Sequence, residues 1–139
     1  MKHLISLLLV FISLGSYAQK SESFFIGSWK TVDVMLAEDS GKEYNDVLEV
    51  VKPGLLKATF LFQANHKGVC KITFPSHPSE AKPSENIYWY YNADSRKLSI
   101  KEWKDRKGFV AEFYVKTDKE NVFFILTDAP MVLKVKKLE

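Results

Sequence analysis

The residues able to do acid–base, nucleophilic or metal chemistry are few and far apart. After residue 19 the chain has two histidines, His66 and His77, and one cysteine, Cys70. The spacing places His66 in a turn, Cys70 inside a strand and His77 in a Pro/Ser-rich segment, so no set of four zinc ligands emerges. No G-x-S-x-G, phosphate-binding loop or C-x-x-C is present, and the acidic residues scatter over predicted turns. We therefore expect no catalytic residue, no metal site and no cofactor.

Cys70 is the single cysteine of the chain. It cannot form an internal disulfide, so the domain must depend on its hydrophobic core for stability. In the alternating run 70–74 it shares a face with Ile72 and Phe74. This pattern favours a buried, slowly reacting thiol over a reactive one.

The aromatic residues are the more informative set. Segment 86–91 has large side chains on both faces of a predicted strand, with Ile87, Trp89 and Tyr91 on one face and Tyr88 and Tyr90 on the other. Either both faces are covered, or the outer tyrosines form an exposed patch that meets a partner. The inward rings either line a cavity for an apolar ligand or fill the interior, since a small barrel has little more room than its own side chains need.

Period-two alternation predicts the elements that position these rings. The eight expected strands cover residues 27–36, 55–63, 68–74, 86–91, 97–102, 109–116, 122–126 and 131–136. The last five are joined by short links, so neighbouring strands must be antiparallel. An eight-stranded up-and-down antiparallel barrel removes the exposed sheet edges and is the expected all-β fold, with a two-sheet sandwich as the alternative.

Two long connections interrupt this pattern. The first carries one short helix between strands one and two, because Tyr44, Val47, Leu48 and Val51 form a helical stripe that Pro53-Gly54 should end. The second, 75–85, contains three prolines and three serines and is expected to be a loop. In an up-and-down barrel both connections lie at one end, which predicts a mouth opposite a base closed by tight turns.

The mouth is the expected place for a small-molecule site. A ligand there would contact the helix and the inward aromatic side chains. The candidate ligand-binding residues are Leu48, Phe60, Phe62, Trp89, Tyr91 and Phe113.

Composition limits the function classes further. With 46% hydrophobic and 27% charged residues, the chain is too apolar for a disordered protein and too charged for a multi-span membrane protein. Its length of 139 residues suits one domain, and a net charge of +3 does not argue for nucleic acid or anionic lipid as a partner. Nothing in the pattern specifies an oligomeric state.

The first 18 residues have the features of a secretory signal peptide. Lys2 precedes an apolar run at 4–14, and the small residues Ser16 and Ala18 precede the expected cleavage point. A retained membrane anchor is the alternative, but it would need roughly 20 apolar residues. We expect the barrel domain to cover 19–139, to carry no membrane anchor after cleavage, and to be periplasmic or secreted.

The segment Phe25-Ile26-Gly27-Ser28-Trp29 resembles the N-terminal G-x-W motif of the lipocalins, and as F-x-G-x-W that of the fatty-acid-binding proteins, both in the calycin superfamily. The resemblance implies that Gly27 lets the chain enter the barrel and that Trp29 plugs its base. Lipocalins also carry a T-D-Y-like motif and an arginine near the end that packs on the tryptophan. Here the last strand offers Lys134 and Lys136 in place of that arginine.

The chain is most similar to a largely uncharacterised group of lipocalin-like proteins exported by Bacteroidetes-type bacteria. The similar segments are Thr59–Phe62 followed by Gly68, and Trp89–Asn92 followed by Lys97–Ile100. Two hypotheses follow. Either the barrel mouth binds a small hydrophobic ligand, or a filled barrel docks another protein through surface aromatics or the 75–85 loop.

Overall fold

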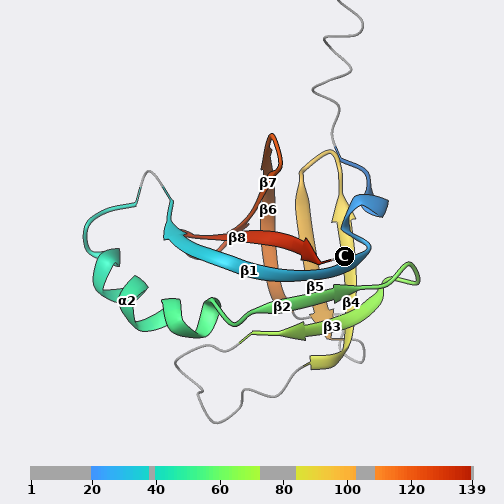
Figure 1. Ribbon diagram of the computed structural model, residues 1–139, viewed down its shortest axis with the longest axis horizontal. Helices are drawn as coiled ribbons and strands as arrows, with labels where there is room; N and C mark the ends of the chain where they lie inside the picture. Colours follow the sequence, from blue (N-terminus) through green and yellow to red (C-terminus); the bar gives the residue numbers. More distant parts are fainter. Residues whose placement is uncertain (1–19, 38–39, 73–83, 103–108, 139) are drawn as a thin grey trace, which may run out of the picture.

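The computed structural model describes residues 20–37, 40–72, 84–102 and 109–138 (Figure 1). One 3-10 helix and one α-helix accompany eight strands. In chain order these are η1 (Glu22–Phe25), β1 (Gly27–Leu36), α2 (Tyr44–Leu55), β2 (Thr59–Phe62), β3 (Lys67–Lys71), β4 (Ser84–Asn92), β5 (Lys97–Glu102), β6 (Phe109–Asp118), β7 (Asn121–Leu126) and β8 (Met131–Leu138).

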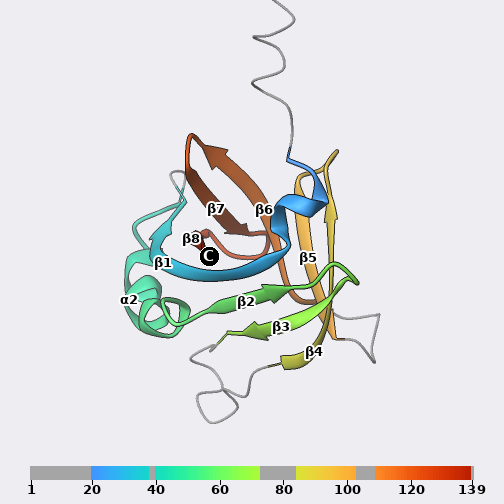
Figure 2. The ribbon, with the colours of Figure 1, turned by 45° about the vertical axis from the view of Figure 1, so that its right-hand side comes forward.

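The strands form one closed barrel in sequence order. Each strand is antiparallel to the next, and β8 returns to pair with β1. Figure 2 shows the strands curving around the common interior, with α2 beside the end of the barrel where β1 ends and β2 begins. The predicted eight-stranded antiparallel barrel, with one helix between the first two strands, is confirmed, and the sandwich alternative is wrong.

The helix extends further than the sequence suggested. Pro53 and Gly54 lie in the last turn of α2, which ends at Leu55. The second strand is therefore shorter than expected and covers Thr59–Phe62. Proline removes one helical hydrogen bond. The turn nevertheless closes, because the Leu56 N–H donates to the Lys52 carbonyl oxygen (2.9 Å) and Leu55 is buried in the barrel core.

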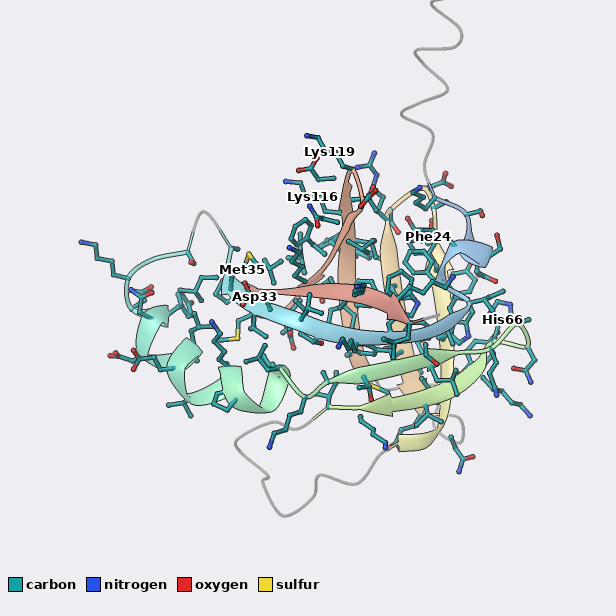
Figure 3. All side chains as sticks on the ribbon, in the orientation of Figure 1. Phe24, Asp33, Met35, His66, Lys116 and Lys119 are labelled. Atoms are coloured by element: carbon teal, nitrogen blue, oxygen red, sulfur yellow. The ribbon has the colours of Figure 1, made fainter. Side chains whose placement is uncertain are left out.

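The end opposite α2 is made of tight turns. The β2–β3, β4–β5 and β6–β7 turns each contain a residue with positive φ, namely His66, Arg96 and Lys119. Figure 3 shows Phe24 and His66 at this end and Asp33 and Met35 toward α2. We call the tight-turn end the base and the α2 end the mouth. Most of the 75–85 connection, including His77, lies outside the described residues.

Candidate functional site

The base is closed from inside by η1 and the start of β1. The Trp29 indole N–H donates a hydrogen bond to the Phe25 carbonyl oxygen at 2.8 Å, and both side chains are almost completely buried. The Phe25 ring also lies 4.4 Å from that of Tyr91, measured between centroids. Because η1 brings the Phe25 ring to 6.3 Å from the Trp29 ring, two aromatic side chains close the base where the sequence indicated one.

Lys137 covers this closure from outside. Its ammonium donates a hydrogen bond to the Phe24 carbonyl oxygen at 3.0 Å and lies 5.7 Å from the Trp29 ring centroid. Gly27 makes room for it, because a Cβ at that position would lie 2.8 Å from Lys137 Cε. The φ of +131° at Gly27 is also one that glycine adopts without strain.

The predicted ligand-binding aromatics contact one another. Four of them have side chains that are at most 2% exposed, namely Phe60, Phe62, Trp89 and Phe113. Ring centroids lie 5.9 Å apart for Phe60–Phe62, 5.8 Å for Phe60–Phe113 and 5.1 Å for Phe62–Trp89. These distances are typical of packed aromatic pairs. The base and middle of the barrel are therefore filled by the protein's own rings.

Trp89 and Tyr91 belong to the base. The Trp89 indole N–H donates to the Gln63 carbonyl oxygen at 2.9 Å, and the Trp89 backbone N–H donates to the carbonyl oxygen of His66. The His66 Nδ1 lies 3.1 Å from the Trp89 carbonyl oxygen, while its Nε2 lies 3.1 Å from a Glu22 carboxylate oxygen. His66 thus joins the β2–β3 turn to β4 and η1, which is a structural role.

Three of the buried side chains nearer the mouth are small. Ala58 just precedes β2, Cys70 is near the end of β3 and Ala111 is near the start of β6, and all three are buried. Burial raises the pKa of the Cys70 thiol to about 12. This pKa agrees with the expected inert cysteine.

Thr31 is the functional candidate that the sequence analysis missed. It is 6% exposed, and its backbone N–H donates to the Ala58 carbonyl oxygen at 3.1 Å. Its hydroxyl Oγ1 is buried and has no hydrogen-bond partner among the described residues. The available signal was a hydroxyl residue two positions after Trp29, on the same inward face of β1. A buried hydroxyl without a partner costs about 1–3 kcal/mol, so this group calls for an explanation.

Helix α2 presents an apolar stripe that is buried at one end only. Leu55 is fully inside, Leu48 and Val51 are half-buried against the core, and Val47 is 45% exposed. An ion pair of 3.7 Å between Lys52 and Asp33 joins the helix to β1. Of the six predicted ligand-binding residues, Leu48 alone comes from this helix, and it is only partly buried where it packs against the hydrophobic core.

The outer side of the barrel carries a second feature. Three tyrosines of β4 and β6 are exposed by 40–50%, namely Tyr88, Tyr90 and Tyr114. A hollow of about 210 Å³ lies beside the two tyrosines of β4 and is lined by Tyr88, Tyr90, Ser99 and Lys101.

The described residues contain no group of three or more His, Cys, Asp or Glu side chains placed to hold a metal ion. Within the same residues, no helix has the length and apolar character needed to cross a membrane.

No family model matches the chain, and no curated protein matches it. Among solved structures, the chain is similar to the crystal structure of a DUF4847 family protein from Bacteroides vulgatus, with 14% identity and a TM-score of 0.46. That match covers 85% of this chain and 98% of the other.

Proposed function

We propose that the protein binds a small, uncharged, largely apolar molecule at the barrel mouth, and that the molecule carries one polar group that pairs with Thr31. The observation that carries this proposal is the buried Thr31 hydroxyl, which has no hydrogen-bond partner in the described part of the chain. A ligand with a hydroxyl, ketone, amide or ester group would satisfy that hydroxyl and recover the free energy lost by burying it.

The absence of charge in the ligand follows from the surroundings of Thr31. Among the described residues no buried side chain carries a charge, and Thr31 is the single buried residue outside the aliphatic, aromatic, sulfur-containing and glycine set. A carboxylate or ammonium brought to this depth would have no buried counter-charge and would be strongly disfavoured. The proposed ligand is therefore a neutral amphiphile or a hydrophobic molecule with one polar atom, and not a fatty-acid anion.

The packing of the barrel determines how deep the ligand can lie. Phe60, Phe113 and Phe124 contact one another at centroid distances of 5.4–5.8 Å and form a floor across the middle of the barrel. Ala58, Cys70 and Ala111 nearer the mouth are small, so the ligand would lie against them and beside the larger Leu55 and Met131. Leu48 and Val51 of α2 would cover its apolar part. In this proposal Phe62, Trp89 and Tyr91 support the floor.

The cellular location of the protein is part of the same proposal. A positive residue, an apolar run and small residues before position 19 are the parts of a secretory signal, so the ligand would be met in the periplasm or outside the cell. Small apolar molecules are poorly soluble in both places, which gives a carrier protein a function there.

The direct test is native mass spectrometry of the full-length gene product after expression in a lipid-rich host. We expect a fraction of the protein to carry one extra mass that is lost on unfolding and that belongs to a neutral lipid-like compound. The proposal is contradicted by protein that stays ligand-free and also shows no saturable uptake of neutral apolar probes.

The alternative is a filled barrel that docks another protein. The observation in its favour is the exposure of Tyr88, Tyr90 and Tyr114 on one outer face. Tyrosine is common in protein interfaces, but lysine is depleted there, and lysines alternate with these tyrosines. Docking through the 75–85 loop concerns residues that mostly lie outside the described ones.

A further inference from the structure

The outer face of β4, β5 and β6 carries aromatic side chains that the mouth does not use. Tyr88 and Tyr90 are exposed by 40% and 50%. They are two residues apart on β4, so their side chains project from the same side of the sheet about 6.6 Å apart. A hollow of about 210 Å³ lies beside these two rings, and Ser99 and Lys101 of β5 complete its lining. We call it the tyrosine hollow.

The Tyr88 ring is held in place by the protein itself. It stacks on the imidazole ring of His66, with ring centroids 5.5 Å apart and planes inclined by 26°. His66 is fixed in turn, because its Nδ1 lies 3.1 Å from the Trp89 carbonyl oxygen and its Nε2 lies 3.1 Å from a Glu22 carboxylate oxygen. It precedes β3, on one side of β4, whereas the hollow extends to β5 on the other side. A ring that is already positioned loses little conformational freedom when a ligand packs on it.

The polar groups beside the hollow offer hydrogen-bond acceptors. The Ser99 hydroxyl donates to the Glu112 carboxylate at 3.3 Å, and the sheet register places both residues in one row with Tyr90. Since the Ser99 proton is used in this bond, the Ser99 oxygen and the remaining lone pairs of the carboxylate are acceptors. The tyrosine hydroxyls both donate and accept. A ligand with several hydroxyl groups is complementary to such a set.

The charges on this face favour a ligand without net charge. The Lys97 ammonium lies 5.3 Å from the Tyr114 ring centroid, and the Glu112 carboxylate belongs to the same strand as Tyr114, so one positive and one negative group balance. Lys101 lines the hollow and Lys67 lies on the neighbouring β3, but each of these two lysines already has an interaction within the protein. Their charge therefore does not select an anionic ligand.

We propose that the tyrosine hollow binds one pyranose ring of a neutral oligosaccharide. The C–H groups on the flat side of a sugar ring carry partial positive charge and pack on the negative face of an aromatic ring. The sugar packs on Tyr88 and Tyr90, and its hydroxyls donate to Ser99 and Glu112. A pocket for a whole drug-sized ligand measures about 300–1,000 Å³. The hollow of about 210 Å³ is smaller, so it holds one ring while the rest of the sugar chain stays outside.

The test is calorimetric titration of the wild-type protein with the neutral cellohexaose, xylohexaose, mannohexaose and maltohexaose, and with the acidic galacturonate hexamer. We expect saturable binding of at least one neutral hexasaccharide, weaker binding of the galacturonate hexamer, and an affinity that changes less than about twofold as salt is raised. Tyr90→Ala should lose roughly tenfold in affinity, as expected when an aromatic stacking contact is removed. Tyr90→Phe, which keeps the ring, should lose less than about threefold.

The matched control is Tyr114→Ala. Tyr114 is 43% exposed on the same outer face, but it is not among the described residues that line the hollow. This variant should lose less than about threefold in affinity, since distant sites act independently. Near-ultraviolet circular dichroism should show that all variants are folded.

The proposal is overturned if none of the four neutral hexasaccharides binds, or if the galacturonate hexamer binds at least as tightly as they do. It is also overturned if Tyr114→Ala weakens binding as much as Tyr90→Ala does. A further contrary result would come from sedimentation velocity, if the wild-type protein forms a dimer that Tyr90→Ala dissociates, because a second copy of the chain would then cover the hollow.

Discussion

The Lys137 ammonium lies 5.7 Å from the ring centroid of Trp29, across the closed base of the barrel. The same group donates a hydrogen bond to the Phe24 carbonyl oxygen, so it joins the last strand to η1. In the β1–β8 register Lys137 pairs with Trp29, whereas Lys136 pairs with Lys30, a residue of the outer face. Lys137 therefore occupies the place for which the sequence suggested Lys134 or Lys136.

Replacing Lys137 tests this contact. Lys137→Met keeps the aliphatic stem but removes the charge and the donor. The free energy of unfolding should fall by about 1 kcal/mol, as expected for a partly exposed cation–π contact and one hydrogen bond. Lys137→Arg should retain most of the stability. Urea denaturation measures both, and equal stability of Lys137→Met and wild type would show that the contact contributes nothing.

Trp29→Ala should be far more costly. The indole is buried against Phe24, Phe25 and Phe124, so its removal opens a large cavity at the base. Loss of a large buried aromatic side chain typically costs about 3–5 kcal/mol. Trp29→Phe should lose less, mainly the hydrogen bond to Phe25. An unfolding midpoint of Trp29→Ala close to that of the wild type would contradict the account of the base.

Cys70 provides a prediction about pH. Burial raises the pKa of its thiol from 9.0 to about 12. The folded state therefore keeps the proton that the unfolded state loses, and stability should fall as pH rises from 9 toward 12, with no contribution from this group below pH 9. Cys70→Ala should remove the part of the stability loss at alkaline pH that comes from this thiol. At pH 8 a thiol reagent should label native protein far more slowly than protein in denaturant, and equal labelling rates would refute burial of the thiol.

Leu48→Gln separates the two possible roles of α2. Leu48 is half-buried at the mouth, so a polar side chain there should lower the uptake of a neutral apolar probe more than it lowers the melting temperature. Leu55→Gln is the matched control at a fully buried position of the same helix and should chiefly destabilise the fold. Absence of probe binding by the parent protein, together with a sharp drop in the melting temperature of Leu48→Gln, would make α2 a plain core element.

Much of the fold could be predicted from alternation alone. The inward positions of Phe60, Phe62 and Phe113 follow from period two, and the antiparallel order follows from the short links. The end of α2 could not be predicted, because burial of Leu55 outweighs the local effect of Pro53. The burial of Leu55 depends on barrel residues that are distant in sequence, so the local pattern around Pro53 could not reveal it.

The candidate site was less predictable for a similar reason. The β1–β8 register shifts between Thr31 and Asp33, and such an irregularity decides which side chains face the interior beyond it. Thr31 looks like an ordinary strand residue until its neighbours are known to offer no hydrogen-bond partner. The sequence also could not show whether Trp89 lines a cavity or supports a turn, because its indole bonds to Gln63, which is 26 residues away.

Thr31→Val tests the proposed function most directly, because it replaces the hydroxyl with a methyl group of similar size. If the hydroxyl is kept for a ligand, the ligand-free variant should be more stable by about 1 kcal/mol, since a buried polar group without a partner is removed. Its affinity for the neutral ketone probe prodan should fall roughly tenfold, a loss of about 1.4 kcal/mol. Affinity for diphenylhexatriene, a hydrocarbon without a polar atom, should be unchanged, and Thr31→Ser should bind prodan as the wild type does. A variant that is less stable than wild type and binds both probes with wild-type affinity would contradict the account.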